Sequence, residues 1–368
     1  MHLKLATAPF LEELQAAARV ASTRSAVQAL SGVQLHAESS GAELRATDME
    51  VGLRLPLAAT VESPGDVVLP ARLLLDVVRS LPGPEVSVEL RAAEGDVEIT
   101  SAGATFRLRT LRNEDFPHLP AATVSGVALE AAPFIDTVAR VSRSASRDDT
   151  RPVLTGILVS ASDHELRMVA TDSYRLSVKT TNLTEAIAEP LEANVPARAL
   201  AEVVRIAQQS EVPSIVISRT ENQIVFTLGG AVLSSRLIDG QFPNYQLLLP
   251  ESADHELRVQ REELAAVVRR ISLLAQKNAP LRLSFSEGEL LVSAQTPDVG
   301  EAREALPVPF SGEAFEIGFN AEFLRDGLES VESDDVLIKL TSALRPGLIE
   351  SADDSQFVYL VMPIRLNT

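Results

Sequence analysis

The stretch Ala170–Leu176, A-T-D-S-Y-R-L, is one of three related passages in this chain of 368 residues. The letters A-T-D also stand at Ala46–Asp48, and a degenerate copy, A-Q-T, begins at Ala294. Ala46, Ala170 and Ala294 follow one another at intervals of 124 residues. Solenoid repeats are about 20–50 residues long, whereas a unit of about 120 residues has the size of a domain. The spacing therefore predicts one domain repeated three times, an arrangement typical of a ring or an arc.

Each third of the chain opens with apolar residues recurring every three or four positions, which predicts an amphipathic helix. Short alternating segments follow and predict strands. The predicted helices are Pro9–Ala21, Pro133–Ser144 and Arg261–Leu274. The predicted strands of the first third are Val33–Ala37, Leu44–Thr47, Gly52–Leu57, Val86–Leu90, Val97–Thr100 and Thr105–Leu111.

A second strand-to-helix pattern lies in the middle of each third. It reads V-V-L-P-A-R-L-L-L-D-V-V, then A-N-V-P-A-R-A-L-A-E-V-V, then I-G-F-N-A-E-F-L-R-D-G-L. Pro70 and Pro196 suit the start of a helix, and Asn320 can cap the third copy. Leu3–Leu14 resembles Val67–Val78, so each domain is predicted to contain two strand–helix–strands units, with sheets behind paired helices.

These patterns predict an α+β fold of three tandem domains, at residues 1–122, 127–250 and 254–368. Linkers are expected near 121–127 and 250–256, where Pro, Ala, Ser and Glu interrupt the periodic pattern.

Composition narrows the class of protein. Apolar residues make up 45% of the chain, as in ordinary globular proteins, without a run long enough for a transmembrane helix. The N-terminus lacks the pattern of a signal peptide. The absence of cysteine excludes disulfides and thiolate metal sites and fits a reducing cytoplasm, where we expect the protein. The net charge of −18, if evenly spread, would repel nucleic acid.

Motifs for chemistry are missing. The sequence has no phosphate-binding loop, dinucleotide fingerprint or nucleophile elbow, and its five histidines are not at metal-ligand spacing. The recurring aspartates Asp48 and Asp172 could be called catalytic. A turn-capping role explains them better, because a structural turn should recur in every repeat. No catalytic residue, metal site or cofactor is predicted.

The basic residues are unevenly placed. The predicted helices carry a small excess of arginine, apart from the last, whereas the strands and loops hold most of the acidic residues. Such helices could face a phosphate backbone through weak, salt-sensitive contacts. Solvation of the same arginines explains the pattern equally well.

Taken together, the chain resembles the bacterial DNA polymerase III beta subunit family, the replicative sliding clamps, over its whole length. The resemblance rests on A-T-D-S-Y-R-L, the V-P-A-R helix starts, Arg236–Tyr245, Ile317–Asn320 and Val361–Leu366. It implies a head-to-tail homodimer in which helices line a ring around duplex DNA and sheets lie outside. Such a clamp tethers the replicative DNA polymerase, the clamp loader and other proteins that carry a clamp-binding motif, without chemistry of its own.

The resemblance also implies a pocket for partner peptides between the second and third domains. Its residues here are Leu154, Thr171, Ser173, Tyr174, Arg175, Leu176, Pro243, Leu247, Leu248, Asn320, Phe323, Leu344, Pro346, Leu360, Val361, Met362, Pro363, Ile364 and Arg365. Apolar side chains would form the cleft, and Arg175 and Arg365 would fix a peptide's polar groups. Leu247, Phe323 and Pro346 replace residues that are commonly Arg, Tyr and Ser, which predicts a more apolar pocket.

For DNA, the resemblance implies Arg24, Arg72 and the loop from Asp148 to Val153. That loop has Pro152 and Val153 where some members have an aromatic pair, and Arg147 and Arg151 could compensate. Helix position adds further candidates: Arg79, Arg140, Arg143, Arg198 and Arg205.

For the dimer interface, the resemblance implies Phe106 and Leu108 on an edge strand of the first domain. They would face Ile271, Leu273 and Leu274 of a second copy. Pairing would remove the aggregation risk of an open edge.

Two alternatives to a clamp are a metal-dependent nuclease that uses the repeated acids and a protein scaffold that holds no DNA.

Overall fold

The computed structural model describes the whole chain except residues 123–125, 251, 276–278, 298, 354–355 and 367–368. The omitted residues include part of each predicted linker. The chain forms two compact units, one of Met1–Ala132 with Arg198–Leu237 and the other of Pro133–Ala197 with Ile238–Thr368. Each unit is described by itself below.

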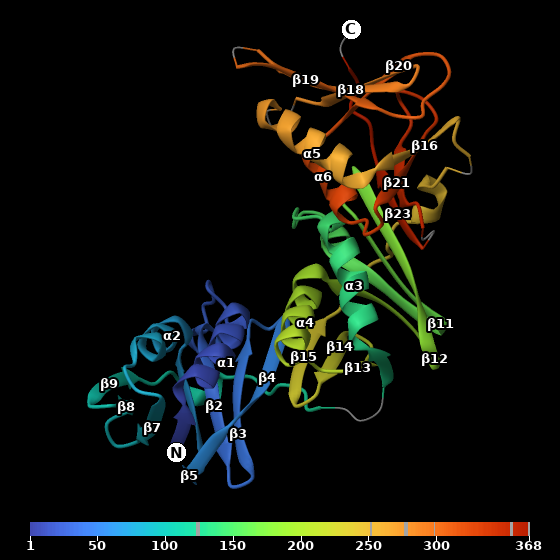
Figure 1. The fold of residues 1–368 in the computed structure, drawn as a ribbon. Coiled ribbons are helices and arrows are strands. Elements are labelled where there is room, and N and C mark those ends of the chain that lie inside the picture. The colour runs from blue at the N-terminus through green and yellow to red at the C-terminus, as the bar shows by residue number, and fades with distance from the viewer. Residues whose placement is uncertain (123–125, 251, 276–278, 298, 354–355, 367–368) are drawn as a thin grey trace. The chain divides into compact units, whose positions relative to one another are not determined.

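The first unit contains two antiparallel sheets and the helices α1 (Thr7–Val20), α2 (Ala71–Ser80) and nearly all of α4 (Ala197–Gln209). Helices α1 and α2 lie side by side (Figure 1). Two short 3-10 helices are η1 (Gln28–Ser31) and η2 (Asn113–Asp115). The strands are β1 (His2–Ala6), β2 (Gly32–Glu38), β3 (Gly41–Thr47), β4 (Val51–Leu57), β5 (Ala59–Ser63), β6 (Gly65–Pro70), β7 (Glu85–Arg91), β8 (Asp96–Ser101), β9 (Ala104–Arg109), β10 (Val127–Glu130), β13 (Ser214–Arg219), β14 (Gln223–Leu228) and β15 (Ala231–Arg236). Their orders are β5-β1-β7-β8-β9 and β10-β13-β14-β15-β4-β3-β2-β6.

The second unit also contains two antiparallel sheets, with nearly all of α3 (Ala131–Val141), and with α5 (Arg261–Ile271) and α6 (Ala321–Glu329). Its 3-10 helices are η3 (Ser142–Ser144), η4 (Pro152–Thr155), η5 (Tyr245–Leu248) and η6 (Ser272–Leu274). The strands are β11 (Gly156–Thr171), β12 (Arg175–Pro196), β16 (His255–Gln260), β17 (Leu281–Ser286), β18 (Glu289–Thr296), β19 (Gly300–Pro307), β20 (Phe315–Phe319), β21 (Asp335–Leu340), β22 (Gly347–Ser351) and β23 (Phe357–Val361). Their orders are β11-β12-β23-β22-β21-β16 and β19-β18-β17-β20.

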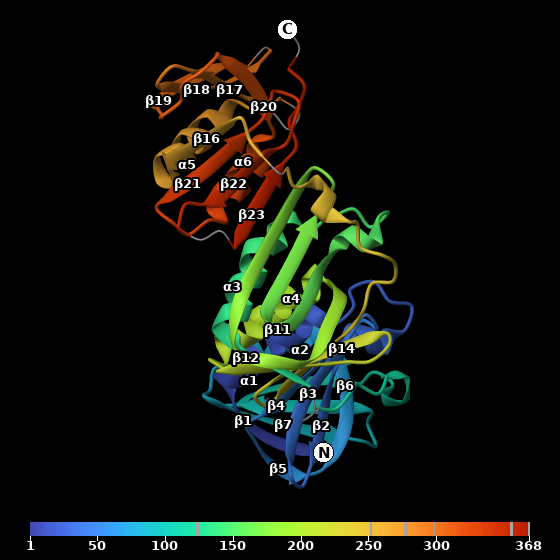
Figure 2. The ribbon, with the colours of Figure 1, turned by 90° about the vertical axis from the view of Figure 1, so that its right-hand side faces the viewer.

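Each unit contains a junction between two consecutive thirds of the chain. In the first unit β4 pairs with β15, and in the second β12 pairs with β23. Figure 2 shows β23 beside the much earlier strand β12. A continuous sheet crosses each junction, so the middle third is divided. Its first half packs with the last third of the chain, and its second half packs with the first third. The division follows the predicted half-repeat.

The predicted elements are confirmed, with small differences at their ends. The helices predicted to reach Ser144 and Leu274 end earlier, and their last turns are the 3-10 helices η3 and η6. Asn320 caps α6 as predicted, because its side-chain oxygen accepts hydrogen bonds from the backbone N–H groups of Glu322 (2.9 Å) and Phe323 (3.1 Å). Such a cap contributes about 1 kcal/mol to stability.

None of the helices in the described part of the chain is long and apolar enough to span a membrane.

Helix α5 buries one face, including Leu264, Val268 and Ile271, in the core of the last third.

Candidate functional site

Asp172 organises the turn between β11 and β12. Its Oδ1 accepts hydrogen bonds from the backbone N–H groups of Tyr174 (2.9 Å) and Arg175 (3.0 Å). The Thr171 hydroxyl donates to the Arg175 carbonyl (2.7 Å) and accepts from the Ser173 N–H (3.1 Å). Ser173 has a φ of 80°, which is uncommon outside glycine. The prediction that the recurring aspartate caps a turn is confirmed.

The same turn recurs in the first unit around Asp48. Its Oδ1 accepts from the N–H groups of Glu50 (3.0 Å) and Val51 (2.8 Å), and Thr47 Oγ1 donates to the Val51 carbonyl (2.8 Å). Met49 has a φ of 78°, close to that of Ser173. The threonine and aspartate supply the acceptors that hold this backbone, which explains why these two residues recur.

The two turns occupy equivalent places at the two junctions. The Arg236 N–H donates to the Glu50 carbonyl (2.8 Å), and the Met362 N–H donates to the Tyr174 carbonyl (2.8 Å). Glu50 therefore corresponds to Tyr174, and Arg236 corresponds to Met362.

The side chains at these equivalent places differ in character. At the first junction the Arg236 and Glu50 side chains form an ion pair at 3.6 Å. At the second junction Tyr174 and Met362 are 60% and 38% exposed, and they lie next to each other. Met49, at the place of Ser173, is exposed at the first junction, so the two junctions differ in the Glu50–Arg236 pair as against Tyr174 and Met362.

We call the exposed apolar residues predicted for the pocket the rim. Its members are Tyr174, Pro243, Leu247, Leu248, Leu344 and Met362. Beneath the rim, Leu176 and Leu360 belong to one buried cluster, against which Phe242, Tyr245 and Leu249 pack. These packed residues carry the segment of Pro243, Leu247 and Leu248 to the same cluster as the Tyr174 turn.

The C-terminal segment also reaches this region. Val361 pairs with Arg175 on one side and with Gly347, next to Pro346, on the other. Ile364 forms a bridge to Gly318 on β20. Pocket candidates from four separate segments therefore lie together: Thr171, Ser173, Tyr174, Arg175, Leu176, Asn320, Phe323, Pro346, Leu360, Val361, Met362, Pro363 and Ile364.

The strand pairs and the buried cluster described above do not join Leu154, Arg365 or the rim residue Leu344 to the other candidates. Leu154 is buried in η4, whereas Leu344 and Arg365 are exposed. The role of every residue in the pocket stays a prediction.

Arg175 does not present its charge as predicted. The side chain is buried: Nε donates to Asp172 (3.1 Å), one terminal nitrogen donates to Asp326 (2.5 Å), and the guanidinium carbon lies 4.4 Å from the centre of the Phe323 ring. Burial disfavours the charge, but Tyr359 and Asp326 more than offset it, so the pKa of Arg175 lies above its ordinary value. This guanidinium binds its own chain, and the expectation that Arg175 also fixes a peptide's polar groups stays a prediction.

Tyr359 lies next to Arg175 and Phe323 and is fully buried. Its hydroxyl donates to the Phe323 carbonyl (2.7 Å). Burial raises the pKa of the Tyr359 phenol above its ordinary value of 10, although Arg175 acts in the opposite direction.

Tyr359 gives a testable pH dependence. The unfolded chain releases the phenol proton near pH 10, whereas the folded chain retains it, so the free energy of unfolding should fall as pH rises above about 10. The expected slope from this group is about 1.4 kcal/mol per pH unit. Urea unfolding at several alkaline pH values would measure it. Tyr359→Phe should flatten the slope, and an equal slope in both proteins would contradict the assignment.

Arg140 is the clearest correction among the DNA candidates. It is 9% exposed, and its guanidinium donates to Asp136 (2.9 Å) and the Ser330 carbonyl (2.8 Å) and pairs with Glu332 (2.5 Å). Through these contacts Arg140 anchors α3 to the segment that follows α6, which leaves its guanidinium little access to phosphate. Helix position could reveal the pair with Asp136, four residues earlier, but not the contact with Ser330, which is 190 residues away.

Several other DNA candidates are exposed but paired. Arg143 lies 2.6 Å from Glu329, Arg198 lies 2.6 Å from Asp48, and Arg205 pairs with Glu202. Arg79 pairs with Asp76 at 3.4 Å, and Arg151 pairs with Asp148 at 3.0 Å while also donating to the Ser173 hydroxyl. Arg24, Arg72 and Arg147 are exposed. Phosphate contact by these residues stays a prediction.

The dimer candidates lie on or near open edges. Strand β9 is an edge of the five-stranded sheet, and β19 is an edge of the four-stranded sheet. Leu273 is 84% exposed, and Phe106 and Leu274 are half-buried. Leu108 and Ile271, by contrast, are 6% and 4% exposed and belong to the cores of their own units, which leaves them little surface for a second copy.

Asp326 was missed at the sequence level. It lies on the buried face of α6, between Leu324 and Leu328, where an acidic residue needs a partner. The signal in the sequence is an acidic residue within the apolar stripe of a helix, which the total charge of that helix does not reveal. The described residues contain no group of acidic or histidine side chains suited to a metal ion.

Comparison with known proteins places these features in a family. Three domain descriptions of the DNA polymerase III beta subunit match in succession: the N-terminal domain over residues 1–120, the central domain over 128–244 and the C-terminal domain over 246–365. The chain belongs to the DNA polymerase III beta subunit family. This confirms the family and the fold of three tandem clamp domains, whereas the predicted domain boundaries stay a prediction.

Relatives of this family cover the whole chain. The beta sliding clamp of Synechococcus elongatus is 33% identical over 88% of each protein, and that of Streptomyces coelicolor is 30% identical over 95% of this chain and 96% of the relative. The sliding clamp of Bartonella birtlesii bound to griselimycin has a TM-score of 0.93 and 29% identity, with each chain fully covered. The chain is thus a processivity clamp of DNA replication and not an enzyme, as predicted.

Proposed function

We propose that this clamp closes into a head-to-tail homodimer around duplex DNA and slides along it while tethering the replicative polymerase. Membership of the sliding-clamp family over the full length carries the proposal. Two open edge strands, β9 and β19, offer surfaces through which two copies could continue their sheets. The clamp loader and other proteins with a clamp-binding motif would share the ring, which would act on DNA in the cytoplasm.

We further propose that partners dock on the rim. The supporting observation is the difference between the two junctions, because equivalent backbone carries an ion pair at Glu50 and Arg236 but apolar side chains at Tyr174 and Met362. Exposed apolar side chains around a buried cluster are typical of binding surfaces. Methionine adapts its shape easily, which suits a surface shared by several partners. Griselimycin, which is bound to two related clamps, is the natural probe for it.

The ring predicts retention that depends on DNA topology. After loading onto nicked circular plasmid, the protein should remain through gel filtration at moderate salt and should be lost once the plasmid is cut to a linear form. The reason is that a closed ring can leave only over an end, whereas phosphate contacts persist on both forms. Equal retention on circular and linear DNA would contradict encirclement. Uncleaved plasmid in magnesium would separate the clamp from a nuclease.

A further inference from the structure

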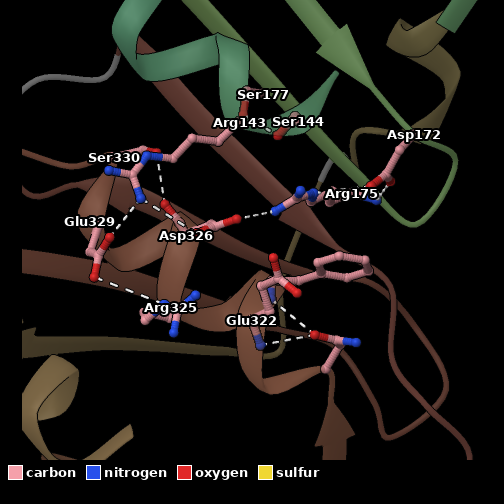
Figure 3. A network of polar contacts seen from close by, with 12 residues as sticks. Arg143, Ser144, Asp172, Arg175, Ser177, Glu322, Arg325, Asp326, Glu329 and Ser330 are labelled. Carbon is pink, nitrogen blue, oxygen red and sulfur yellow. Dashed lines mark hydrogen bonds and ion pairs between the residues drawn. The ribbon is translucent and has the colours of Figure 1, made fainter. Parts of the chain in front are cut away.

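One buried carboxylate on α6 serves two arginines from the middle third of the chain. Asp326 is 9% exposed, and its Oδ2 accepts a hydrogen bond from Arg175 at 2.5 Å. Its Oδ1 accepts from Arg143 at 3.4 Å. Figure 3 shows Asp326 between the two arginines, with Glu329 on the side of Arg143 and Asp172 on the side of Arg175. Asp326 therefore joins the α6 segment to the turn that carries Tyr174.

The Arg175 guanidinium is fixed from several directions. Asp172 holds Nε at 3.1 Å, Asp326 holds a terminal nitrogen, and the Phe323 ring lies 4.4 Å from the guanidinium carbon. A planar guanidinium can meet carboxylates at its edge and an aromatic ring at its face. Removing the charge of Asp326 would leave a buried cation with one carboxylate fewer, so Arg175 would be expected to move.

A movement of Arg175 would reach the rim through Phe323. The Phe323 ring stacks with the exposed Tyr174 ring at a centroid distance of 6.4 Å. Tyr174 in turn holds Met362 through the backbone hydrogen bond described above. The chain of contacts from Asp326 to the rim thus passes through Arg175, Phe323 and Tyr174.

We propose that Asp326 is a positioning residue for partner binding: it does not touch the partner but holds Arg175 against Phe323 and so sets the shape of the rim. The inference rests on the proposed docking function of the rim. It assigns the Asp326 charge to recognition as well as to stability.

The test compares Asp326→Asn with Glu329→Gln in the full-length protein. Both changes remove one carboxylate charge from α6 that faces Arg143, but Asp326 pairs with Arg175 whereas Glu329 pairs with Arg143 and Arg325. Fluorescent griselimycin is the probe, and its affinity is measured well below the unfolding temperature of every variant. Asp326→Asn should weaken binding about tenfold, because the rim would have to be reordered before the ligand binds, at a cost comparable to one hydrogen bond to a charged group. Glu329→Gln should bind as the unchanged protein does.

A spectroscopic readout distinguishes positioning from general destabilisation. The chain has no tryptophan and three tyrosines, Tyr174, Tyr245 and Tyr359, all in the second unit near the rim. The tyrosine near-ultraviolet circular dichroism should change in folded Asp326→Asn but not in Glu329→Gln. Asp326→Glu, which keeps the charge, should recover at least part of both signals.

Two results would overturn the inference: full griselimycin affinity in Asp326→Asn, or equal losses in Asp326→Asn and Glu329→Gln. The proposed docking function fails separately, if the unchanged protein does not bind griselimycin or if a change at Met362 leaves that binding intact.

Discussion

Replacing Phe106 with glutamate should convert the proposed dimer into monomers. Phe106 is half-buried on β9, an edge strand of its sheet. A second copy that pairs with this edge would have to bury the new carboxylate without a partner, which costs several kcal/mol. Because dimerisation depends on concentration, the shift should appear as a halved mass by light scattering at micromolar protein.

The control for Phe106→Glu lies on the opposite edge of the same sheet. Val61 is also half-buried, on the edge strand β5, and Val61→Glu introduces the same charge at a matched position. We expect Val61→Glu to remain dimeric, and Leu273→Glu to dissociate as Phe106→Glu does. A dimeric Phe106→Glu protein would contradict the interface, and dissociation of Val61→Glu as well would indicate a general loss of sheet stability.

The second large effect is expected from Tyr174→Glu combined with Met362→Arg. This pair copies Glu50 and Arg236, which the equivalent backbone at the first junction already accommodates as an ion pair. The fold should therefore tolerate it, while the rim loses two of its apolar side chains and gains two charges. Burying those charges against an apolar ligand is unfavourable, so griselimycin affinity should fall at least about a hundredfold.

Two further measurements make this result specific. The dimer mass and the retention on circular DNA should be unchanged, because neither substitution is on β9 or β19. The reverse exchange, Glu50→Tyr with Arg236→Met, should leave griselimycin affinity at the second junction intact. Retained affinity in the Tyr174→Glu, Met362→Arg protein would place the docking site elsewhere, and loss of the dimer would give these residues a structural role.

Much of the fold follows from local patterns. The helix and strand positions, the Asn320 cap and the turn at Asp172 each depend on neighbours within a few residues, so periodicity and turn chemistry were sufficient to predict them. The helix ends at Ser144 and Leu274 were less predictable, because an apolar pattern does not distinguish a final α-helical turn from a 3-10 turn.

The states of individual arginines were not predictable in this way. The sequence around Arg140 and Arg175 looks like that around an exposed arginine of a helix or turn. Both side chains are nevertheless buried against acids or carbonyls of the last third. A sum of charges along a helix ignores partners that are more than a hundred residues away. The asymmetry between Tyr174 and Glu50 was visible in the repeat, but its meaning depended on which later residue pairs with each.

The sequence by itself determined the triplication, the element order and the family, because these are carried by spacing and by short-range chemistry. Only the tertiary structure decided which arginine side chains are exposed and which are bound by acids or carbonyls of the same chain. It did so by continuing each sheet across a junction, which places the end of one third against the turn of the one before. Ion pairs and aromatic contacts act over a few ångströms, so their partners are determined by the folded arrangement of distant segments.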